Sequence, residues 1–148
     1  MALENSCYVR IGRLMEIDVA AGYHSVADVD SMSAMMQAAL AKIPSSTKLV
    51  IAADWRACKV LSPAVAERVT EMLISVNSRI ERAGILHSAS QATSTMQILR
   101  LVHDAHSTDR RVFKSVQEMA EWLGEVLPPI ERARLHAFLD PGGLVDRR

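Results

Sequence analysis

The stretch that decides the fold is residues 49–56, Leu49-Val50-Ile51-Ala52-Ala53-Asp54-Trp55-Arg56, in which five apolar residues run into an aspartate, a tryptophan and an arginine. An apolar run of this length between polar residues is typical of a buried β-strand. Ser62-Pro63 then predicts a helix start, because serine accepts a backbone hydrogen bond at the N-cap and proline fits the first helical position. The segment therefore predicts a buried strand followed by a capped helix.

The chain on the N-terminal side predicts two further elements. Residues 8–19 alternate apolar and polar side chains around Gly12-Arg13, which is typical of a β-hairpin or of one bent strand. Ser25 stands at capping-box distance from Asp28, and apolar residues recur at helical spacing as far as Pro44. We expect a hairpin and then a helix before the decisive strand.

The chain on the C-terminal side repeats the alternation of strand and helix. The predicted elements are a strand over 80–87, a helix over 92–106, a short strand over 111–114 and a helix over 116–127. Pro128-Pro129 ends the last of these, and residues 130–139 predict a short amphipathic helix followed by a flexible tail. The fold class is thus α/β: a mixed β-sheet with an N-terminal hairpin, four helices and a short C-terminal helix. We assign 1–127 to this domain and 128–148 to its C-terminal helix and tail.

The composition of the 148 residues limits the classes of function. Lysine plus arginine and aspartate plus glutamate both number 17, and only Arg110, Arg111 and Lys114 cluster, so we expect no nucleic-acid partner. Cys7 and Cys58 show no metal-type spacing and are interpreted as free thiols of a reducing compartment. No apolar run approaches the roughly 18 residues of a membrane span, and the N-terminus does not resemble a signal peptide. We expect a cytoplasmic protein without stable membrane insertion.

The residues that follow the decisive strand are the first candidates for a site. Asp54, Trp55 and Arg56 come at its carboxyl end, where open α/β sheets place their ligand crevices, and the Ser62 helix begins nearby. The plainer alternative is that Asp54 and Arg56 form an ordinary ion pair, that Trp55 packs in the core and that Ser62 only caps a helix.

Two other groups of residues are also candidates for a site. His87, His103 and His106 could supply ligands to a metal, although a histidine near a helix C-terminus is also favoured by the helix dipole. The predicted helix over 92–106 is apolar on more than one face, so it is either enclosed in the domain or shared with a partner. The interface candidates are Ile98, Leu101, Leu135, Phe138 and Leu139. No glycine-rich phosphate loop or nucleophile elbow is present, and we expect no cofactor and no resident metal.

The order of elements over residues 7–127, together with the strand-to-helix segment 49–72, resembles the STAS/SpoIIAA-like superfamily. In that family an aspartate ends the strand and an Asp-Ser-Ser/Thr-Gly motif starts the helix, where it presents a phosphorylatable hydroxyl. Asp54 matches the strand-end aspartate, whereas Ser62-Pro63-Ala64 stands where the motif would be, with Ser62 in place of the acid. The chain is therefore more similar to stand-alone bacterial members of the STAS/SEC14 type, which lack the motif.

The resemblance implies a regulatory or ligand-binding module and not an enzyme. The leading hypothesis is a non-enzymatic module that docks a protein partner, or a second copy of itself, through Asp54, Trp55, Arg56 and Ser62. The alternative is a carrier in which a methionine-lined crevice takes a lipid or a nucleotide-like ligand. A metal-dependent hydrolase built on the three histidines is the third hypothesis.

Overall fold

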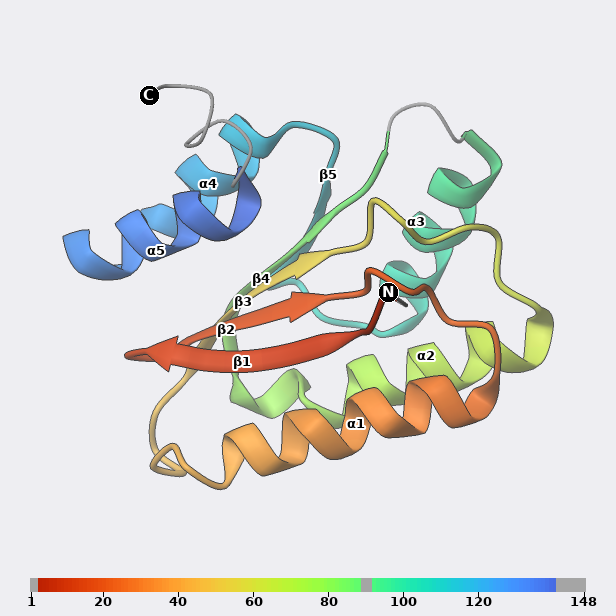
Figure 1. Cartoon of the computed structure of the whole chain (residues 1–148), viewed down its shortest axis with the longest axis horizontal. Helices are drawn as coiled ribbons and strands as arrows, with labels where there is room; N and C mark the ends of the chain where they lie inside the picture. The colour runs from red at the N-terminus through yellow and green to blue at the C-terminus, as the bar shows by residue number, and fades with distance from the viewer. Residues whose placement is uncertain (1–2, 89–91, 141–148) are drawn as a thin grey trace.

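The strands form one five-stranded sheet in which spatial order follows chain order, β1-β2-β3-β4-β5. Figure 1 shows a computed structural model of the chain, and the structure describes residues 3–88 and 92–140. The strands are β1 (Ser6–Ile11), β2 (Leu14–Asp18), β3 (Leu49–Asp54), β4 (Ile80–Leu86) and β5 (Arg110–Phe113). β1 runs antiparallel to β2, and each of the other neighbouring pairs is parallel. The predicted hairpin is therefore confirmed, and β1 and β5 are the edge strands.

Five α-helices in the described residues cover the two faces of this sheet. They are α1 (Val26–Leu40), α2 (Pro63–Ser75), α3 (Ala92–Asp104), α4 (Val116–Gly124) and α5 (Pro129–Leu139). Serine caps three of them: the hydroxyls of Ser25, Ser62 and Ser115 accept from the backbone N–H groups of Asp28, Val65 and Glu118. These short side chains satisfy donors that have no partner within the helix, which is why the helix starts were visible in the sequence.

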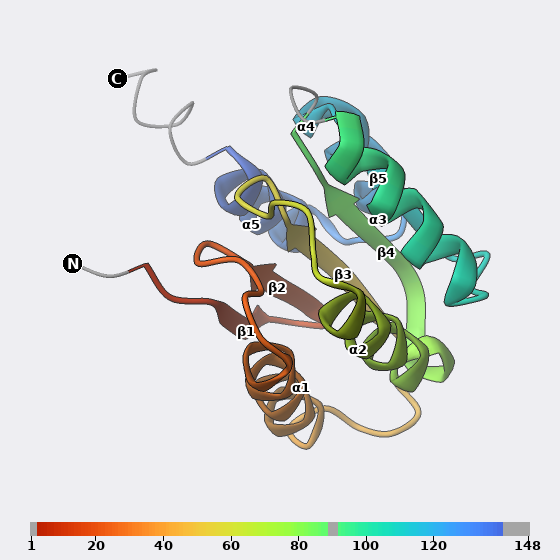
Figure 2. The same cartoon turned by 90° about the vertical axis from the view of Figure 1, so that its right-hand side faces the viewer.

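The central strand, β3, is buried on both faces, and its successive residues point alternately into two separate cores. Leu49, Ile51 and Ala53 pack with α1, α2 and α3, while Val50 and Ala52 pack with α4 and α5. Figure 2 shows α1 and α2 on one side of the sheet and α5 on the other. A strand enclosed in this way has a continuous apolar sequence, as 49–53 does.

Polar contacts hold α5 against the sheet. Glu16 of β2 is only 2% exposed and accepts two hydrogen bonds of 2.7 Å from the guanidinium of Arg134. The Glu131 carboxylate accepts from the backbone N–H of Arg13, at 3.1 Å, in the turn between β1 and β2. Gly12 precedes that turn residue with a φ of 56°, and a Cβ there would collide with Glu131. The turn and α5 therefore fit together only with glycine at this position.

Element boundaries differ slightly from the sequence-based prediction. β5 begins at Arg110, and α4 ends at Gly124, three residues before the predicted end. Of the predicted tail, which begins at Asp140, residues 141–148 lie outside the described residues. No helix in the described part of the chain is long and apolar enough to cross a membrane.

Candidate functional site

Asp54 and Arg56 form a bidentate ion pair at the carboxyl edge of the sheet. The Arg56 guanidinium donates to both oxygens of Asp54, at 3.0 and 2.8 Å, and the backbone N–H of Arg56 donates to the same carboxylate. The guanidinium also donates to the backbone carbonyl of Leu139 at the end of α5, at 3.1 Å. The pair therefore ties the loop after β3 to α5, and these two residues do form the ion pair that the plainer alternative expected.

Asp18 adds a second carboxylate at the same edge, because it is the register partner of Asp54 on the adjacent strand β2. Its pKa is raised, first by partial burial and then by the negative charge of Asp54, while Arg56 acts in the opposite direction. The hydrogen bond with Asp54 is the main cause of the raised pKa of Arg56. The edge is thus polar, and the Arg56 guanidinium is engaged there by Asp54 and by α5.

Trp55 does not lie on the surface. Its side chain is buried in the core under α1 and α2, and its ring meets that of Tyr23 edge to face, with centroids 6.0 Å apart and planes at 87°. Its backbone N–H donates to the carbonyl of Leu86 on β4. Trp55 is therefore a packing residue, and placing it in a docking surface was wrong.

Ser62 lies at the exposed end of the loop that leaves the edge. Its hydroxyl caps α2 by accepting from the N–H of Val65 at 3.4 Å. Within residues 3–88 and 92–140, it makes no hydrogen bond or ion pair with Asp54 or Arg56. Gln97 of α3 holds the loop from the other side: its amide oxygen accepts from the N–H of Leu61, and its amide nitrogen donates to the Leu61 carbonyl, both at 2.8 Å.

The predicted interface residues are mostly core residues. Ile98 and Leu101 of α3 are buried under that helix, and Leu135 and Leu139 of α5 are buried under theirs, while Phe138 is partly buried against the same core. These side chains fill the cores of the chain itself, so the enclosed-helix alternative is correct for Ile98 and Leu101. The exposed apolar residues of α3 are Met96 and Leu99, which sequence reasoning did not separate from their neighbours.

The histidines do not converge. His87 is fully buried at the end of β4, and neither of its ring nitrogens has a hydrogen-bond partner among the described residues. His103 lies in the last turn of α3 and His106 lies just after the helix, and their ring centroids are 6.5 Å apart. No three His, Cys, Asp or Glu side chains in the described part of the chain are grouped so that they could hold a metal ion. Residues 3–88 and 92–140 therefore offer no geometry that supports the hydrolase hypothesis.

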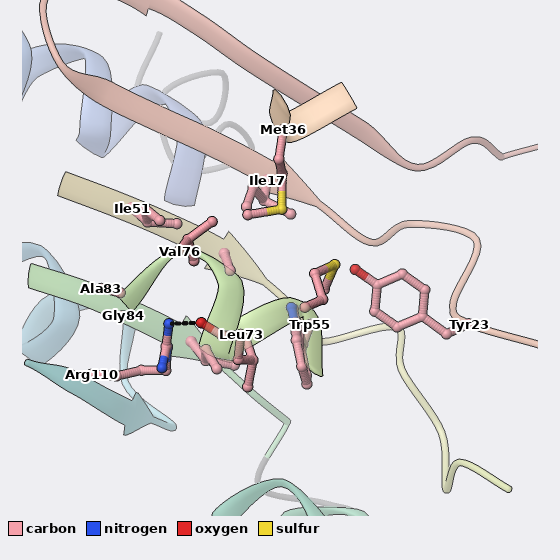
Figure 3. A pocket seen from close by; sticks show the side chains of 13 residues that line it. Ile17, Tyr23, Met36, Ile51, Trp55, Leu73, Val76, Ala83, Gly84 and Arg110 are labelled. Atoms are coloured by element: carbon pink, nitrogen blue, oxygen red, sulfur yellow. Dashed lines mark hydrogen bonds between the residues drawn. The ribbon is translucent and has the colours of Figure 1, made fainter. Parts of the chain in front are cut away.

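A small cavity lies between the sheet and α2, and two of its polar groups were not predicted. Apolar side chains line most of it, including Met36 and Met72, with the Tyr23 ring at one end and Arg110 toward the other (Figure 3). The Tyr23 hydroxyl is buried without a partner in residues 3–88 and 92–140. Arg110 donates to the Leu73 carbonyl and to the side-chain oxygen of Asn77, and burial lowers its pKa to about 10.

The size of this cavity bears on the carrier hypothesis. Its volume of about 30 Å³ is enough for roughly one water molecule. A lipid or a nucleotide does not fit there in this conformation. No feature of a single sequence distinguishes Tyr23 and Arg110 from the other tyrosine and arginines, because their burial depends on how distant elements pack.

A five-stranded mixed sheet that begins with an antiparallel hairpin and carries helices on both faces places the chain among SpoIIAA-like α/β folds. No family model matches the chain, and no curated protein sequence matches it. Among solved structures it is similar to an uncharacterized protein of the DUF3478 family, with a SpoIIAA-like fold, from Shewanella loihica PV-4. The TM-score is 0.55 at 15% identity, and the match covers 83% of this chain and 98% of that one. The likeness shows the fold, and it confirms the SpoIIAA-like prediction.

Proposed function

We propose that this chain is a non-enzymatic regulatory module of the STAS type that docks a protein partner through residues 56–62, here called the docking loop. The observation that carries the proposal is that this loop is fixed at both ends and still exposed in its middle. Asp54 holds Arg56, and Gln97 holds Leu61 through two hydrogen bonds of 2.8 Å. A loop held in this way loses little conformational entropy when a partner binds.

The exposed middle of the docking loop favours a particular kind of partner. Lys59 and Val60 are both exposed, and Val60 is among the most exposed large apolar side chains. Lys59 forms no ion pair with any residue that the structure describes. A partner segment with an apolar anchor beside an acidic group would match both side chains.

The test begins with a photo-crosslinking amino acid at position 60, with the same probe at position 130 of α5 as a control. Ile130 is an exposed apolar residue on the opposite side of the sheet. The protein captured from position 60 is then purified, and its affinity for the chain is measured by calorimetry. Lys59→Glu with Val60→Asp should weaken binding roughly tenfold or more, and Ile130→Asp should leave it unchanged.

The outcome that contradicts the proposal is equal affinity for the docking-loop variant and the wild-type chain. The same holds if positions 60 and 130 capture the same proteins. Alanine at Asp54 and Arg56 is a poorer test, since these residues also hold α5, and their loss would change stability as well as binding.

A further inference from the structure

The outer edge of β1 carries unpaired backbone groups. β1 pairs with β2 on one side, and no strand within residues 3–88 and 92–140 pairs with its other side. In an antiparallel ladder alternate residues bond to the neighbouring strand, so the N–H and C=O groups of the remaining residues point away from the sheet. Figure 2 shows β1 at the end of the row of strands, beside α1. The edge can therefore accept one more strand.

A shallow hollow lies beside this edge, between β1 and α1. Residues 4–8 border it on one side, and Met35, Ala38 and Ala39 of α1 are among the residues on the other. A strand added to β1 would turn every second side chain toward α1. These apolar residues of α1 would cover such side chains.

The edge at the other end of the sheet is protected in a way that β1 is not. β5 has only four residues, and the exposed Arg111 and Lys114 keep positive charge on it and just after it, which is a common defence of an edge strand. β1 has six residues and contains neither proline nor lysine. Its ladder with β2 is irregular only between Val9 and Ile11, where the register shifts. Regular pairing on the outer side therefore extends as far as Val9.

Two opposite charges flank the regular part of this edge. Glu4 and Arg10 are six positions apart, so an extended chain turns both side chains to the same face of the sheet. Glu4 is exposed and forms no ion pair with any residue that the structure describes. Arg10 is 49% exposed, and its Nε lies 3.4 Å from Glu16, whose carboxylate already accepts two hydrogen bonds from Arg134. The Arg10 guanidinium therefore has donors left for another molecule.

We infer that the outer edge of β1 is a self-association surface at which β1 of a second copy of this chain pairs antiparallel to the first. A two-fold axis perpendicular to the sheet keeps each face of the sheet on its own side, so each residue faces one that belongs to the same face. With this axis beside Cys7, Glu4 of each copy faces Arg10 of the other. The two sheets then become one continuous sheet that carries an ion pair at either end of the new ladder.

The same register uses the regular part of β1. Asn5 of one copy faces Val9 of the other, and Ser6 faces Tyr8, all on the near side of the register shift. Moving the axis by one residue in either direction displaces the pairing by two residues, and then neither of the two charges faces its opposite. The charge pattern therefore selects a second copy in one register, because a two-fold pair supplies both complementary contacts at once.

The shortness of the new ladder limits the strength of the association. Residues 5–9 of each copy form its regular part, so the pair buries less surface than a standard stable interface. We expect a dimer with a dissociation constant of about 10 to 100 μM, which forms and dissociates with concentration. This pairing goes beyond the proposed docking function and does not involve the docking loop.

Sedimentation velocity over a range of concentrations, on residues 1–148, tests the ion pairs. Glu4→Arg alone and Arg10→Glu alone should each raise the dissociation constant roughly tenfold, because like charges then face each other at both ends of the ladder. The matched controls are Glu67→Arg on α2 and Arg100→Glu on α3, which make the same changes of charge at exposed positions away from β1. Both controls should dimerise like the wild type.

A mixture of the two β1 variants gives a test that only a contact between molecules can pass. Glu4→Arg and Arg10→Glu in equal amounts should form a heterodimer in native mass spectrometry, in preference to either homodimer. In that heterodimer the introduced arginine faces the introduced glutamate, and the retained Arg10 faces the retained Glu4. Because Arg10 also lies near Glu16, urea denaturation first establishes that Arg10→Glu is folded. If it is not, Glu4→Arg and its Glu67→Arg control decide the question.

Three results would overturn the inference: a wild-type chain that stays monomeric at millimolar concentration, a dimer as tight in Glu4→Arg as in the wild type, or a mixture of folded variants without heterodimer. A monomeric chain whose β1 amides become protected from hydrogen exchange only when another protein binds would give the edge a different occupant, and would equally overturn it. A monomeric chain that still binds a partner through position 60 would remove this inference alone and leave the docking proposal intact.

Discussion

At the scale of single residues, the Tyr23 hydroxyl is an uncompensated polar group. It is buried and has no hydrogen-bond partner among the described residues, and burial is the main cause of its raised pKa. Removing a buried polar atom that makes no bond relieves its desolvation cost, so Tyr23→Phe should raise the free energy of unfolding by about 1 kcal/mol, measured by urea denaturation. Tyr8→Phe, at a half-exposed position, is the control and should change nothing. A clear loss of stability in Tyr23→Phe would mean that an ordered water bonds the hydroxyl.

The burial of the two cysteine thiols predicts how the free energy of unfolding changes at alkaline pH. Burial raises the pKa of the Cys7 thiol from 9.0 to about 11 and that of Cys58 to about 12. Between pH 9.0 and about 11 the unfolded chain therefore loses thiol protons that the folded chain still holds, so the free energy of unfolding falls as pH rises. The stabilising contribution of the two thiols is complete below pH 9.0 and is lost as the pH rises from there through their folded-state pKa values.

The measurement is urea denaturation at about pH 8 and about pH 10.5 under reducing conditions, and Cys7→Ser with Cys58→Ala is the variant. It should show a smaller loss of stability between the two conditions than the wild type, because only the wild type ionises these thiols on unfolding. Equal losses in both proteins would contradict the burial of the thiols.

At the scale of elements, the attachment of α5 depends on a buried charge. Glu16 is enclosed under α5, and Arg134 supplies both of its short hydrogen bonds, while the Arg10 guanidinium lies 3.4 Å from it. Removing Arg134 leaves the enclosed carboxylate of Glu16 with only the more distant and exposed Arg10 guanidinium to compensate its charge. Arg134→Ala should cost about 2 to 3 kcal/mol, somewhat below a fully buried pair because Arg134 is partly exposed.

The double variant Glu16→Gln with Arg134→Met is the matched control, since it removes the charge together with its partner. It should recover much of the lost stability, and hydrogen exchange should show that Arg134→Ala loosens α5 before the rest of the chain. A uniform increase in exchange over all helices would argue against a local role for this pair.

At the scale of the whole molecule, the features that could be predicted from the sequence are those that depend on local chemistry. The three serine caps, the apolar run of β3 and the glycine turn of the hairpin each follow from a few neighbouring residues. Which way a side chain points relative to distant elements could not be predicted from neighbouring residues. Trp55 looked like a site residue because it ends a strand, but it turns inward onto Tyr23. Ile98 and Met96 are both apolar residues of α3, and only the packing of α3 on β5 and α2 separates core from surface.

The assignment of 128–148 to the same domain leads to a prediction about the whole chain. Leu135 and Leu139 of α5 fill the core under α4 and α5, where Leu14, Val50 and Leu86 of the sheet meet them. Without α5 the part of this core that lies over β2 would face water, although α4 would still cover β4 and β5, and Glu16 would lose Arg134. A chain that ends at residue 127 should therefore fail to fold cooperatively, unlike the full chain. Circular dichroism melts of the truncated and the full chain test this. A cooperative melt of the shorter chain near the full-length temperature would show that α5 is an appendage and not part of the domain.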